Sequence, residues 1–385
     1  MVRKVRVGMV GGGAGAFIGE IHRKALSLDG ELELVAGAFH RDPERSCAFG
    51  ASLGLASSRQ YRDWQEMLSK ERERPTDERV DLISIVTPND VHAPIAIAAL
   101  EAGFHVMSEK PAARTLDEAL EIEEAVRQTG LIYAVAQTYL GYPMVRQARA
   151  LVADGAIGPI RKIIVEYVQG WLSQTVETDG QKQAAWRTDP VVAGPGGAIG
   201  DIGVHAASLA EYIAGSPMTE LCASLTAFGS GRVLDDDASL LFRMENGAQG
   251  VLTASQICAG EENGLSIRIY GEEGGLSWRQ EEPNTLWHAP LDGPAQRWRA
   301  GADRGYLSPA VRSQMRTPAG HPEGYIEAFA NLYRDVAAAV RDLGEGEAAY
   351  PGIDMGLSTL AFVDAILRNT RDDEKWTRVK DRGAL

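Results

Sequence analysis

A glycine-rich stretch near the N-terminus constrains the fold of this chain more than any other sequence feature. Residues 11–19 read GGGAGAFIG, directly after the short apolar run 5–10 and before a segment of helical character at 22–27. Glycines between a strand and a helix let main-chain N–H groups approach a pyrophosphate, whose charge the helix N-terminus favours. This context predicts a dinucleotide-binding loop, the alternative being a glycine-rich turn without a ligand.

The spacing of these glycines departs from the usual G-x-G-x-x-G pattern. Gly11 and Gly13 fit that pattern, but Gly19 lies three residues later than the third glycine should. We therefore expect a longer loop than usual between the strand and the helix. The residues of this loop expected to contact the cofactor are Gly11, Gly13, Ala14, Phe17 and Ile18.

Strands alternate with helical segments through the first part of the chain. The expected strands are residues 5–10, 32–39, 80–86, 105–108 and 132–136. Such alternation predicts a parallel sheet with right-handed crossovers, the doubly wound α/β arrangement. We assign residues 1–140 to this dinucleotide-binding domain.

The pattern changes after residue 140 to regularly spaced, β-branched runs. The expected strands are residues 160–168, 221–228, 238–244, 248–255 and 265–270, and Asn246-Gly247 is a strong hairpin signal. Helices are expected at 145–153, 204–213, 324–342 and 356–369, and residues 281–320 are expected to form extended loops. We assign residues 141–385 to a second, α+β domain that binds substrate and mediates oligomerisation, with the last helix free to pack back on the first domain.

The residues after the second expected strand bear on the choice of cofactor. The acidic residue expected there is absent, since the sequence reads Phe39-His40-Arg41-Asp42 and Asp42 followed by Pro43 is better explained as a helix N-cap. Arg41 would tolerate a 2′-phosphate, whereas His40 could equally bond a ribose hydroxyl. The sequence therefore leaves both NAD(H) and NADP(H) open.

Two further segments follow the third and fourth expected strands, at the sheet edge where such folds bind ligands. Thr87-Pro88-Asn89 with His92 could reach the ribose or the nicotinamide, the alternative being a plain turn and helix cap. Lys110, fixed between a strand end and Pro111, could polarise a reacting alcohol oxygen or relay its proton. Most lysines are solvated surface charges, and only its position singles out Lys110.

A third cluster, residues 194–205, combines glycines with an acid and an imidazole. Asp201 and His205 are four residues apart, so both face the same way if this segment begins a helix. A carboxylate that orients an imidazole makes a good general base for an alcohol proton. The alternative is a helix N-terminus capped by Asp201 with a structural histidine.

Taken together, these clusters resemble the Gfo/Idh/MocA family, the glucose–fructose oxidoreductase and inositol dehydrogenase group. The matching pieces are Gly19 with His22, Thr87-Pro88-Asn89 with His92, Glu109-Lys110-Pro111, and Gly-Gly-xxx-Asp-x-Gly-x-His over residues 196–205. The resemblance implies an N-terminal Rossmann domain with tightly held NAD(H) or NADP(H). It also implies a C-terminal domain on an open, mostly antiparallel sheet whose exposed face joins a homodimer or homotetramer.

The same resemblance implies roles for individual residues. Lys110, Asp201 and His205 would be the catalytic trio, with His205 as the acid/base. Glu109 and Pro111 would shape the nicotinamide pocket. Further assignments to the cofactor or substrate site are Gln137, Trp186, Arg187 and His321, the last by likeness to one branch of the family.

The sequence thus predicts reversible oxidation of a secondary alcohol on a cyclic polyol, sugar or glycoside, with hydride passing to C4 of the nicotinamide. Tyr139, Trp171 and Trp186 are candidate walls for a sugar, although each could be plain core. One alternative is NAD-assisted glycoside cleavage without net redox. Another is a non-enzymatic dinucleotide-binding sensor, which the presence of all three catalytic residues disfavours.

The amino-acid composition limits the kinds of partner that this protein is expected to bind. The net charge of −14 disfavours nucleic acid and anionic membranes, and no apolar stretch is long enough to span a bilayer. Without a signal-like N-terminus we expect a cytoplasmic protein. Cys47, Cys222 and Cys258 are far apart and include no C-x-x-C pair, so we expect free thiols and no metal site.

Overall fold

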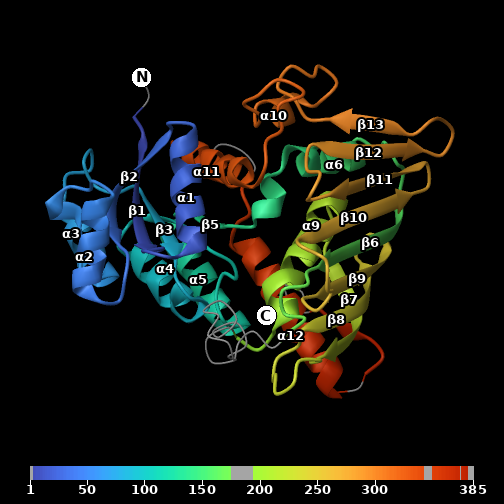
Figure 1. Cartoon of the computed structure of the whole chain (residues 1–385), viewed down its shortest axis with the longest axis horizontal. Helices are drawn as coiled ribbons and strands as arrows, with labels where there is room; N and C mark the ends of the chain where they lie inside the picture. The colour runs from blue at the N-terminus through green and yellow to red at the C-terminus, as the bar shows by residue number, and fades with distance from the viewer. Residues whose placement is uncertain (1–2, 175–193, 342–348, 373, 380–385) are drawn as a thin grey trace. The chain divides into compact units, whose positions relative to one another are not determined.

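The chain folds into two compact units in a computed structural model that describes residues 3–174, 194–341, 349–372 and 374–379 (Figure 1). The first unit comprises Met1–Thr138 and Tyr325–Leu357. The second comprises Tyr139–Gly324 and Ser358–Leu385. Each unit is built on its own β-sheet.

The sheet of the first unit has five parallel strands, which confirms the doubly wound fold predicted from the sequence. In spatial order they are β2 (Leu32–Ala38), β1 (Val5–Gly11), β3 (Leu82–Val86), β4 (His105–Ser108) and β5 (Tyr133–Val135). Every residue of β3 is buried, as expected of a strand in a sheet with helices on both faces. The strand order changes direction between β1 and β3, where ligands bind in such sheets.

Helices connect these strands and pack on the sheet. They are α1 (Phe17–Leu28), α2 (Pro43–Ser52), α3 (Trp64–Arg72), α4 (His92–Glu101) and α5 (Leu116–Thr129). The cap predicted at Asp42 is confirmed, and Thr115 caps α5 in the same way. The Asp42 carboxylate accepts hydrogen bonds from the N–H groups of Glu44 and Arg45, and the Thr115 hydroxyl accepts one from Glu118 N.

One helix of the first unit comes from late in the chain. Helix α11 (Tyr325–Arg341) packs beside α1, and its apolar face joins the core that β1 also enters (Figure 1). Phe329 and Tyr333 are almost fully buried there, against residues such as Val7 and Met9. The domain boundary that we expected at residue 140 would assign α11 to the second domain. In the structure, the burial of its apolar face groups α11 with the first unit.

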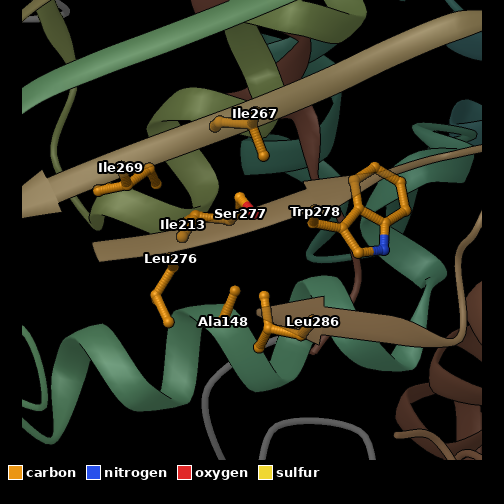
Figure 2. A pocket seen from close by; sticks show the side chains of 8 residues that line it. All are labelled: Ala148, Ile213, Ile267, Ile269, Leu276, Ser277, Trp278 and Leu286. Carbon is orange, nitrogen blue, oxygen red and sulfur yellow. The ribbon is translucent and has the colours of Figure 1, made fainter. Parts of the chain in front are cut away.

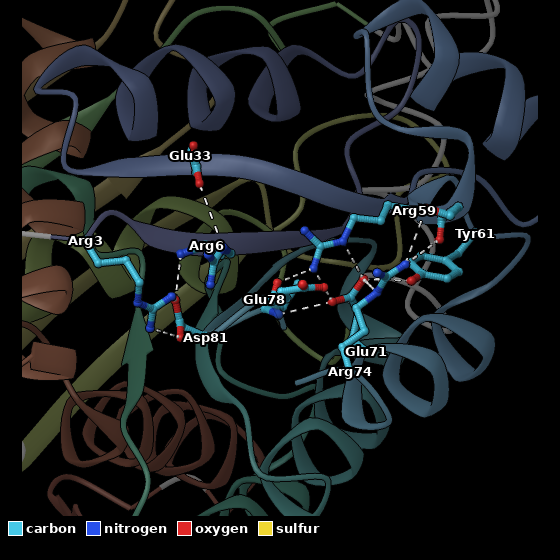
Figure 3. Close-up of polar contacts among 11 residues, drawn as sticks. Arg3, Arg6, Glu33, Arg59, Tyr61, Glu71, Arg74, Glu78 and Asp81 are labelled. Atoms are coloured by element: carbon cyan, nitrogen blue, oxygen red, sulfur yellow. Dashed lines mark hydrogen bonds and ion pairs between the residues drawn. The ribbon is translucent and has the colours of Figure 1, made fainter. Parts of the chain in front are cut away.

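A buried carboxylate ties α3 to the segments around it (Figure 3). Glu71 is fully buried and accepts hydrogen bonds from the Arg59 guanidinium, at 2.8 and 3.1 Å, and from the Tyr61 hydroxyl, at 2.7 Å. It also accepts one from the main-chain N–H of Val80, which precedes β3. A buried carboxylate is stable only when cations and hydrogen-bond donors surround it, so these contacts fix the packing of α3.

The second unit contains a nine-stranded, mostly antiparallel sheet, as expected. In order its strands are β13 (Gln296–Arg299), β12 (Thr285–Pro290), β11 (Gly274–Arg279), β10 (Gly264–Gly271), β6 (Ile160–Val168), β9 (Gln249–Ser255), β8 (Asp237–Met244), β7 (Met218–Thr226) and β14 (Thr377–Arg378). Among the described strand pairs of this sheet, only β6 and β9 are parallel. The hairpin predicted at Asn246-Gly247 joins β8 to β9, with Gly247 at φ +87°.

Helices α6 (Pro143–Ala153) and α9 (Val204–Ala214) pack against this sheet. Figure 2 shows a small apolar pocket between them and strands β10 to β12. Its lining residues are Ala148, Ile213, Ile267, Ile269, Leu276, Ser277, Trp278 and Leu286. Because this lining lacks convergent polar groups, the pocket belongs to the core and does not suit a polyhydroxylated ligand.

The expectation of extended loops over residues 281–320 was wrong. The region contains the strands β12 and β13 and the short helix α10 (Pro309–Arg312). Within β12, Leu286 and His288 point inward while Trp287 between them is exposed, a period-2 pattern hidden by the surrounding prolines, glycines and arginines. These strands extend the sheet on the side of β10 and β11.

Several further observations concern the described residues as a whole. The three cysteines are free and half-buried. No group of three or more His, Cys, Asp or Glu side chains in the described part of the chain is arranged to hold a metal ion. Within the same residues, no helix combines the length and the apolar character that crossing a membrane requires.

Candidate active site

The glycine loop of the first unit brings three strand ends close together. A Cβ on Gly11 would lie 2.4 Å from the carbonyl oxygen of Val86 at the end of β3, and one on Gly13 would lie 2.6 Å from that of Phe39, just after β2. Gly11 also has φ +81°, a conformation that other residues rarely adopt. Only glycine therefore fits at these two positions, where the main chain is left bare.

Gly19 explains the unusual spacing of the loop. A Cβ on Gly19 would lie 2.4 Å from the Cα of Gly12, so the first turn of α1 rests directly on the end of β1. This close helix–strand packing is the task of the third glycine in the usual fingerprint. The additional residues form a turn at Ala14 and Gly15, as the expectation of a longer loop requires.

The N-terminus of α1 suits a bound phosphate group. Ala16 occupies the N-cap position and supplies no side-chain hydrogen bond, and the Phe17 side chain is exposed. The first N–H groups of a helix favour negative charge when no side chain caps them. Arg23 donates a 2.5 Å hydrogen bond to the carbonyl oxygen of Gly12, which holds the loop from below.

The residues after β2 offer no carboxylate that is clearly aimed at a ribose. Asp42 is engaged as the cap of α2, and its main-chain N–H donates to Nδ1 of His40 at 2.9 Å. Arg41 is exposed. This arrangement is compatible with a cofactor that carries either a hydroxyl or a phosphate at the 2′ position.

The segment after β3 divides into an exposed and a buried part. Pro88 is exposed and Asn89 is half-buried, whereas His92 is completely buried. Its Nδ1 lies 2.8 Å from the carbonyl oxygen of Pro111 and its Nε2 lies 2.9 Å from that of Thr87. His92 therefore ties two loops together beneath the surface, and its ring nitrogens are engaged by main chain rather than directed at a ribose.

The Thr87 hydroxyl is a buried polar atom with no hydrogen-bond partner among the described residues. It lies beside Gly11, since a Cβ on that glycine would be 2.7 Å from the Thr87 methyl group. An orphaned hydroxyl next to a bare glycine loop fits a site whose ligand supplies the missing partner. The first unit thus fits a dinucleotide in both shape and chemistry.

Glu109, Lys110 and Pro111 follow β4 and reach the same edge of the sheet. Glu109 is buried, Lys110 is half-buried, and the peptide bond between Lys110 and Pro111 is cis. Glu109 Oε1 lies 2.8 Å from Nε2 of His22 on α1, and Glu109 Oε2 accepts a 3.1 Å hydrogen bond from Lys110 N. Gln137, after β5, is buried at the neighbouring strand end.

A hydrogen-bonded chain continues from His22 into the core of the first unit. Nδ1 of His22 lies 2.6 Å from the Tyr333 hydroxyl, which lies 2.8 Å from the Ser84 hydroxyl on β3. The sequence analysis did not anticipate Ser84 or Tyr333. Tyr333 is 311 positions from His22, and nothing in the sequence of α11 marks it as a partner of the glycine-loop helix.

In the second unit, Asp201 and His205 lie on one continuous helical segment. Asp201 is within a π-helical turn, Ile199–Gly203, that leads directly into α9, where His205 is buried. Oδ2 of Asp201 accepts a 2.9 Å hydrogen bond from the Gln256 side chain. Asp201 is therefore not the cap of this helix, which was the alternative interpretation.

The cap belongs to Asp235, which the sequence analysis did not single out. Its carboxylate accepts hydrogen bonds from the N–H groups of Gly197, at 2.6 Å, and Ile199, at 2.8 Å. Burial raises the pKa of Asp235, while these main-chain bonds oppose the shift. A Cβ on Gly197 would lie 1.9 Å from the Asp235 carbonyl oxygen, so glycine is required for this contact.

Aromatic and amide side chains surround His205. The Tyr139 ring meets the imidazole edge to face at 4.9 Å, and the Tyr139 hydroxyl lies 2.5 Å from that of Tyr167. Tyr167 donates to Oδ1 of Asn263 at 2.6 Å, and the Asn263 amide reaches back to the Tyr139 hydroxyl at 3.3 Å. Burial raises the pKa of Tyr139, so its hydroxyl stays protonated.

Trp171 joins the same network through its indole nitrogen. It donates to the Gln169 side chain at 3.0 Å, and Gln169 donates to Asn263 at 2.9 Å. Gln169 and Trp171 stand two residues apart after Tyr167, so the alternation of β6 could have indicated Gln169. The sequence offers no comparable signal for Gln256 and Asn263.

Of the remaining predicted site residues, only His321 lies among the described residues, and it is not part of these groups. His321 is exposed, and its carbonyl oxygen accepts a hydrogen bond from the Thr317 hydroxyl. Trp186 and Arg187 lie outside the described residues.

Comparison with known proteins decides the family. Residues 5–137 match the model described as an oxidoreductase family with an NAD-binding Rossmann fold, and residues 145–277 match the GFO/IDH/MocA C-terminal domain. The chain belongs to the GFO/IDH/MocA family. Its first unit is an NAD-binding domain and the protein is an oxidoreductase.

Relatives in this family match nearly the whole chain. The uncharacterized oxidoreductase YfiI of Bacillus subtilis strain 168 is 34% identical, over 98% of both chains. Levoglucosan dehydrogenase of Pseudarthrobacter phenanthrenivorans is 27% identical over 98% of this chain and 99% of its own. The crystal structure of an inositol dehydrogenase homolog from Azotobacter vinelandii, complexed with NAD⁺, is 36% identical over 98% of both chains with a TM-score of 0.92.

These relatives bear on the two groups of residues. The Azotobacter protein has also been crystallised with NADH and myo-inositol, and levoglucosan dehydrogenase with NADH and levoglucosan. In the present chain, the glycine loop with the orphaned Thr87 hydroxyl supplies the cofactor-fitting surface. The groups around His205 in the second unit are polar and aromatic side chains that carry hydroxyl, amide and carboxylate groups.

Proposed function

We propose that this oxidoreductase oxidises a secondary alcohol of a cyclic polyol, sugar or glycoside in a reversible, NAD(P)-dependent reaction. The observation that carries the proposal is the network around His205, in which Tyr139, Tyr167 and Asn263 place aromatic faces and hydrogen-bonding groups beside an imidazole. Aromatic faces pack against the C–H surface of a sugar, while amides and hydroxyls bond its hydroxyl groups. Relatives named for inositol and levoglucosan support this substrate class.

The cofactor would be held by the glycine loop and the start of α1. Main-chain N–H groups at Gly11 to Gly13 and at Phe17 and Ile18 would bond the pyrophosphate. When bound, the nicotinamide would supply the acceptor for the hydride that leaves the carbinol carbon. His40 and Arg41 would lie nearest the 2′ position of the ribose, and they allow NAD(H) or NADP(H) there.

Lys110, Asp201 and His205 would act on the substrate hydroxyl. His205 would accept the proton that leaves the hydroxyl oxygen during oxidation and return it during reduction. Asp201, itself bound by Gln256, would orient the imidazole and favour its protonated form. The Lys110 ammonium would bond the same oxygen and stabilise negative charge that develops on it.

The outer face of the large sheet supports self-association as part of this proposal. Leu241 on β8, Tyr270 on β10 and Trp287 on β12 are 47%, 42% and 44% exposed. Apolar side chains exposed on several strands of one sheet suit an interface between copies of the chain. Light scattering of the purified protein would give the oligomeric state.

A spectrophotometric screen tests the proposed activity. NAD⁺ and NADP⁺ are each combined with a panel of cyclic polyols, sugars and glycosides, and the reduced cofactor is measured. On the best substrate, Lys110→Ala and His205→Ala should each lower kcat by about 100-fold or more, as loss of acid–base catalysis does. The control Lys70→Ala, which removes an exposed lysine, should retain full turnover.

Two outcomes would contradict the proposal. Full turnover by both the Lys110 and His205 variants would remove these residues from the site. Conversion of a glycoside by enzyme as isolated, with no reduced cofactor formed in bulk, would replace net oxidation with NAD-assisted cleavage.

A further inference from the structure

The residues on both sides of Lys110 are bound by buried histidines from two different helices. On one side, His22 of α1 contacts the carboxylate of Glu109. On the other, His92 of α4 contacts the carbonyl oxygen of Pro111. Both imidazoles are 0% exposed, so they belong to the interior of the first unit and not to its ligand-facing surface.

The partners of His22 give its hydrogen bonds a consistent direction. An ionised carboxylate only accepts, so Nε2–H of His22 donates to Glu109. In the tautomer whose Nδ1 carries no proton, Nδ1 accepts from the Tyr333 hydroxyl. The Tyr333 oxygen in turn accepts from Ser84. With this tautomer, inferred from the partners, each group in the chain Ser84–Tyr333–His22–Glu109 is satisfied.

Glu109 passes this constraint to Lys110. One of its carboxylate oxygens binds His22, and the other accepts the hydrogen bond of the Lys110 main-chain N–H at 3.1 Å. The carboxylate therefore cannot rotate without losing one of two charge-assisted bonds. Tyr333, on a helix more than 200 positions further along the sequence, thus acts on the backbone of residue 110.

We propose that His22, Tyr333 and His92 are positioning residues that fix the backbone of Lys110, so that its ammonium meets the substrate hydroxyl in a single geometry. The inference rests on the proposed role of Lys110. A lysine side chain has much rotational freedom, and a fixed backbone reduces the number of places its ammonium can occupy. Small misplacements of a catalytic group lower turnover strongly, without comparable loss of binding.

The first unit contains a matched control for these buried bonds. The Tyr61 hydroxyl is likewise buried and donates to the carboxylate of Glu71 at 2.7 Å (Figure 3). This cluster holds α3, and none of its described bonds reaches the Glu109–Pro111 segment. Tyr333→Phe and Tyr61→Phe each delete one buried hydroxyl from the same unit. A purely structural role for Tyr333 predicts similar consequences for both.

The kinetic experiment compares these two variants on the best substrate. Tyr333→Phe should lower kcat by about 10-fold or more, in the range expected for misplacement of a catalytic group. It should leave KM nearly unchanged and displace the pH profile of kcat. Tyr61→Phe should change the melting temperature but neither kcat nor the pH profile. His92→Gln, which retains one amide donor, should resemble Tyr333→Phe.

A second readout does not depend on activity. Hydrogen–deuterium exchange of peptides that contain the Lys110 amide, measured with NAD⁺ present, should be faster in Tyr333→Phe than in the wild type and in Tyr61→Phe.

A double variant tests whether Tyr333 acts through Lys110. When Tyr333→Phe is combined with Lys110→Ala, it should cause no further loss of kcat, because the effects of residues that act through one another are not additive.

The outcomes separate the two proposals. If Lys110→Ala keeps full turnover, the proposed role of Lys110 fails and this inference fails with it. If Lys110→Ala is inactive while Tyr333→Phe and Tyr61→Phe have equal kcat, equal pH profiles and equal exchange at Lys110, only the positioning role is overturned.

Discussion

Gly19 on α1 and Gly12, directly after β1, are in close main-chain contact: a Cβ on Gly19 would lie 2.4 Å from the Gly12 Cα and 2.5 Å from its carbonyl oxygen. This contact sets the distance between the first turn of the helix and the sheet. The N–H groups expected to bind the pyrophosphate keep their position only because residue 19 has no Cβ.

Gly19→Ala should weaken NAD⁺ binding and destabilise the first unit. The new methyl group would meet main-chain atoms that cannot rotate away, so we expect a loss of about 1–3 kcal/mol in the free energy of unfolding, typical of overpacking. Chemical denaturation and titration with NAD⁺ measure the two effects. Gly305→Ala is the control, since a Cβ there meets nothing within 4 Å. Equal NAD⁺ affinity in both variants would contradict the assignment of the loop.

Asp42 should prove to be a helix cap and not a ribose ligand. Asp42→Ala should lower the free energy of unfolding by about 1 kcal/mol, the usual cost of a lost cap. Asp42→Ser keeps an acceptor for the N–H groups of Glu44 and Arg45, so it should restore stability and leave the dissociation constant of NAD⁺ unchanged. A clear loss of NAD⁺ affinity in the serine variant, with stability intact, would show that the carboxylate contacts the cofactor.

The sequence predicted the first unit well because its signals are local. Strand–helix alternation, the glycine loop and the caps at Asp42 and Thr115 each depend on neighbouring residues, and all appear in the structure. The return of α11 to this unit depends instead on the burial of its apolar face against α1, a contact between distant segments. No local pattern distinguishes this partner from another.

The candidate site was predictable in part for the same reason. Lys110, Asp201 and His205 stand in short motifs, whereas two groups that hold the Asp201 segment come from elsewhere in the chain. Gln256, directly after β9, donates to Asp201. Asp235, two residues before β8, accepts a hydrogen bond from the main chain of Gly197. Sequence reasoning identifies groups that carry chemistry more readily than the groups that hold them in place.

Gln256→Leu should reduce turnover through Asp201. Gln256 is 2% exposed and donates to Oδ2 of the half-buried Asp201, so its replacement leaves that carboxylate oxygen without this donor. We expect kcat to fall by about 10-fold, at the lower end of effects on acid–base catalysis, with a smaller change in NAD⁺ affinity. Gln60→Leu, which removes a side-chain bond to the Leu55 carbonyl oxygen in the first unit, is the matched control. Equal kcat in the two variants would exclude support of Asp201 by Gln256.

Alkaline solution should destabilise the protein partly through Tyr61. Burial, together with the hydrogen bond to Glu71, raises the pKa of this hydroxyl from 10.0 to about 12. The unfolded chain releases the proton near pH 10 while the folded chain retains it, so the stabilising contribution is complete below pH 10 and is lost as the pH rises toward 12. Urea unfolding at a series of pH values should show a decline that is shallower in Tyr61→Phe than in the wild type. Some decline should remain in the variant, because burial also raises the pKa of Tyr133 and Tyr333. Identical slopes in the two proteins would mean that Tyr61 ionises at the same pH in both states.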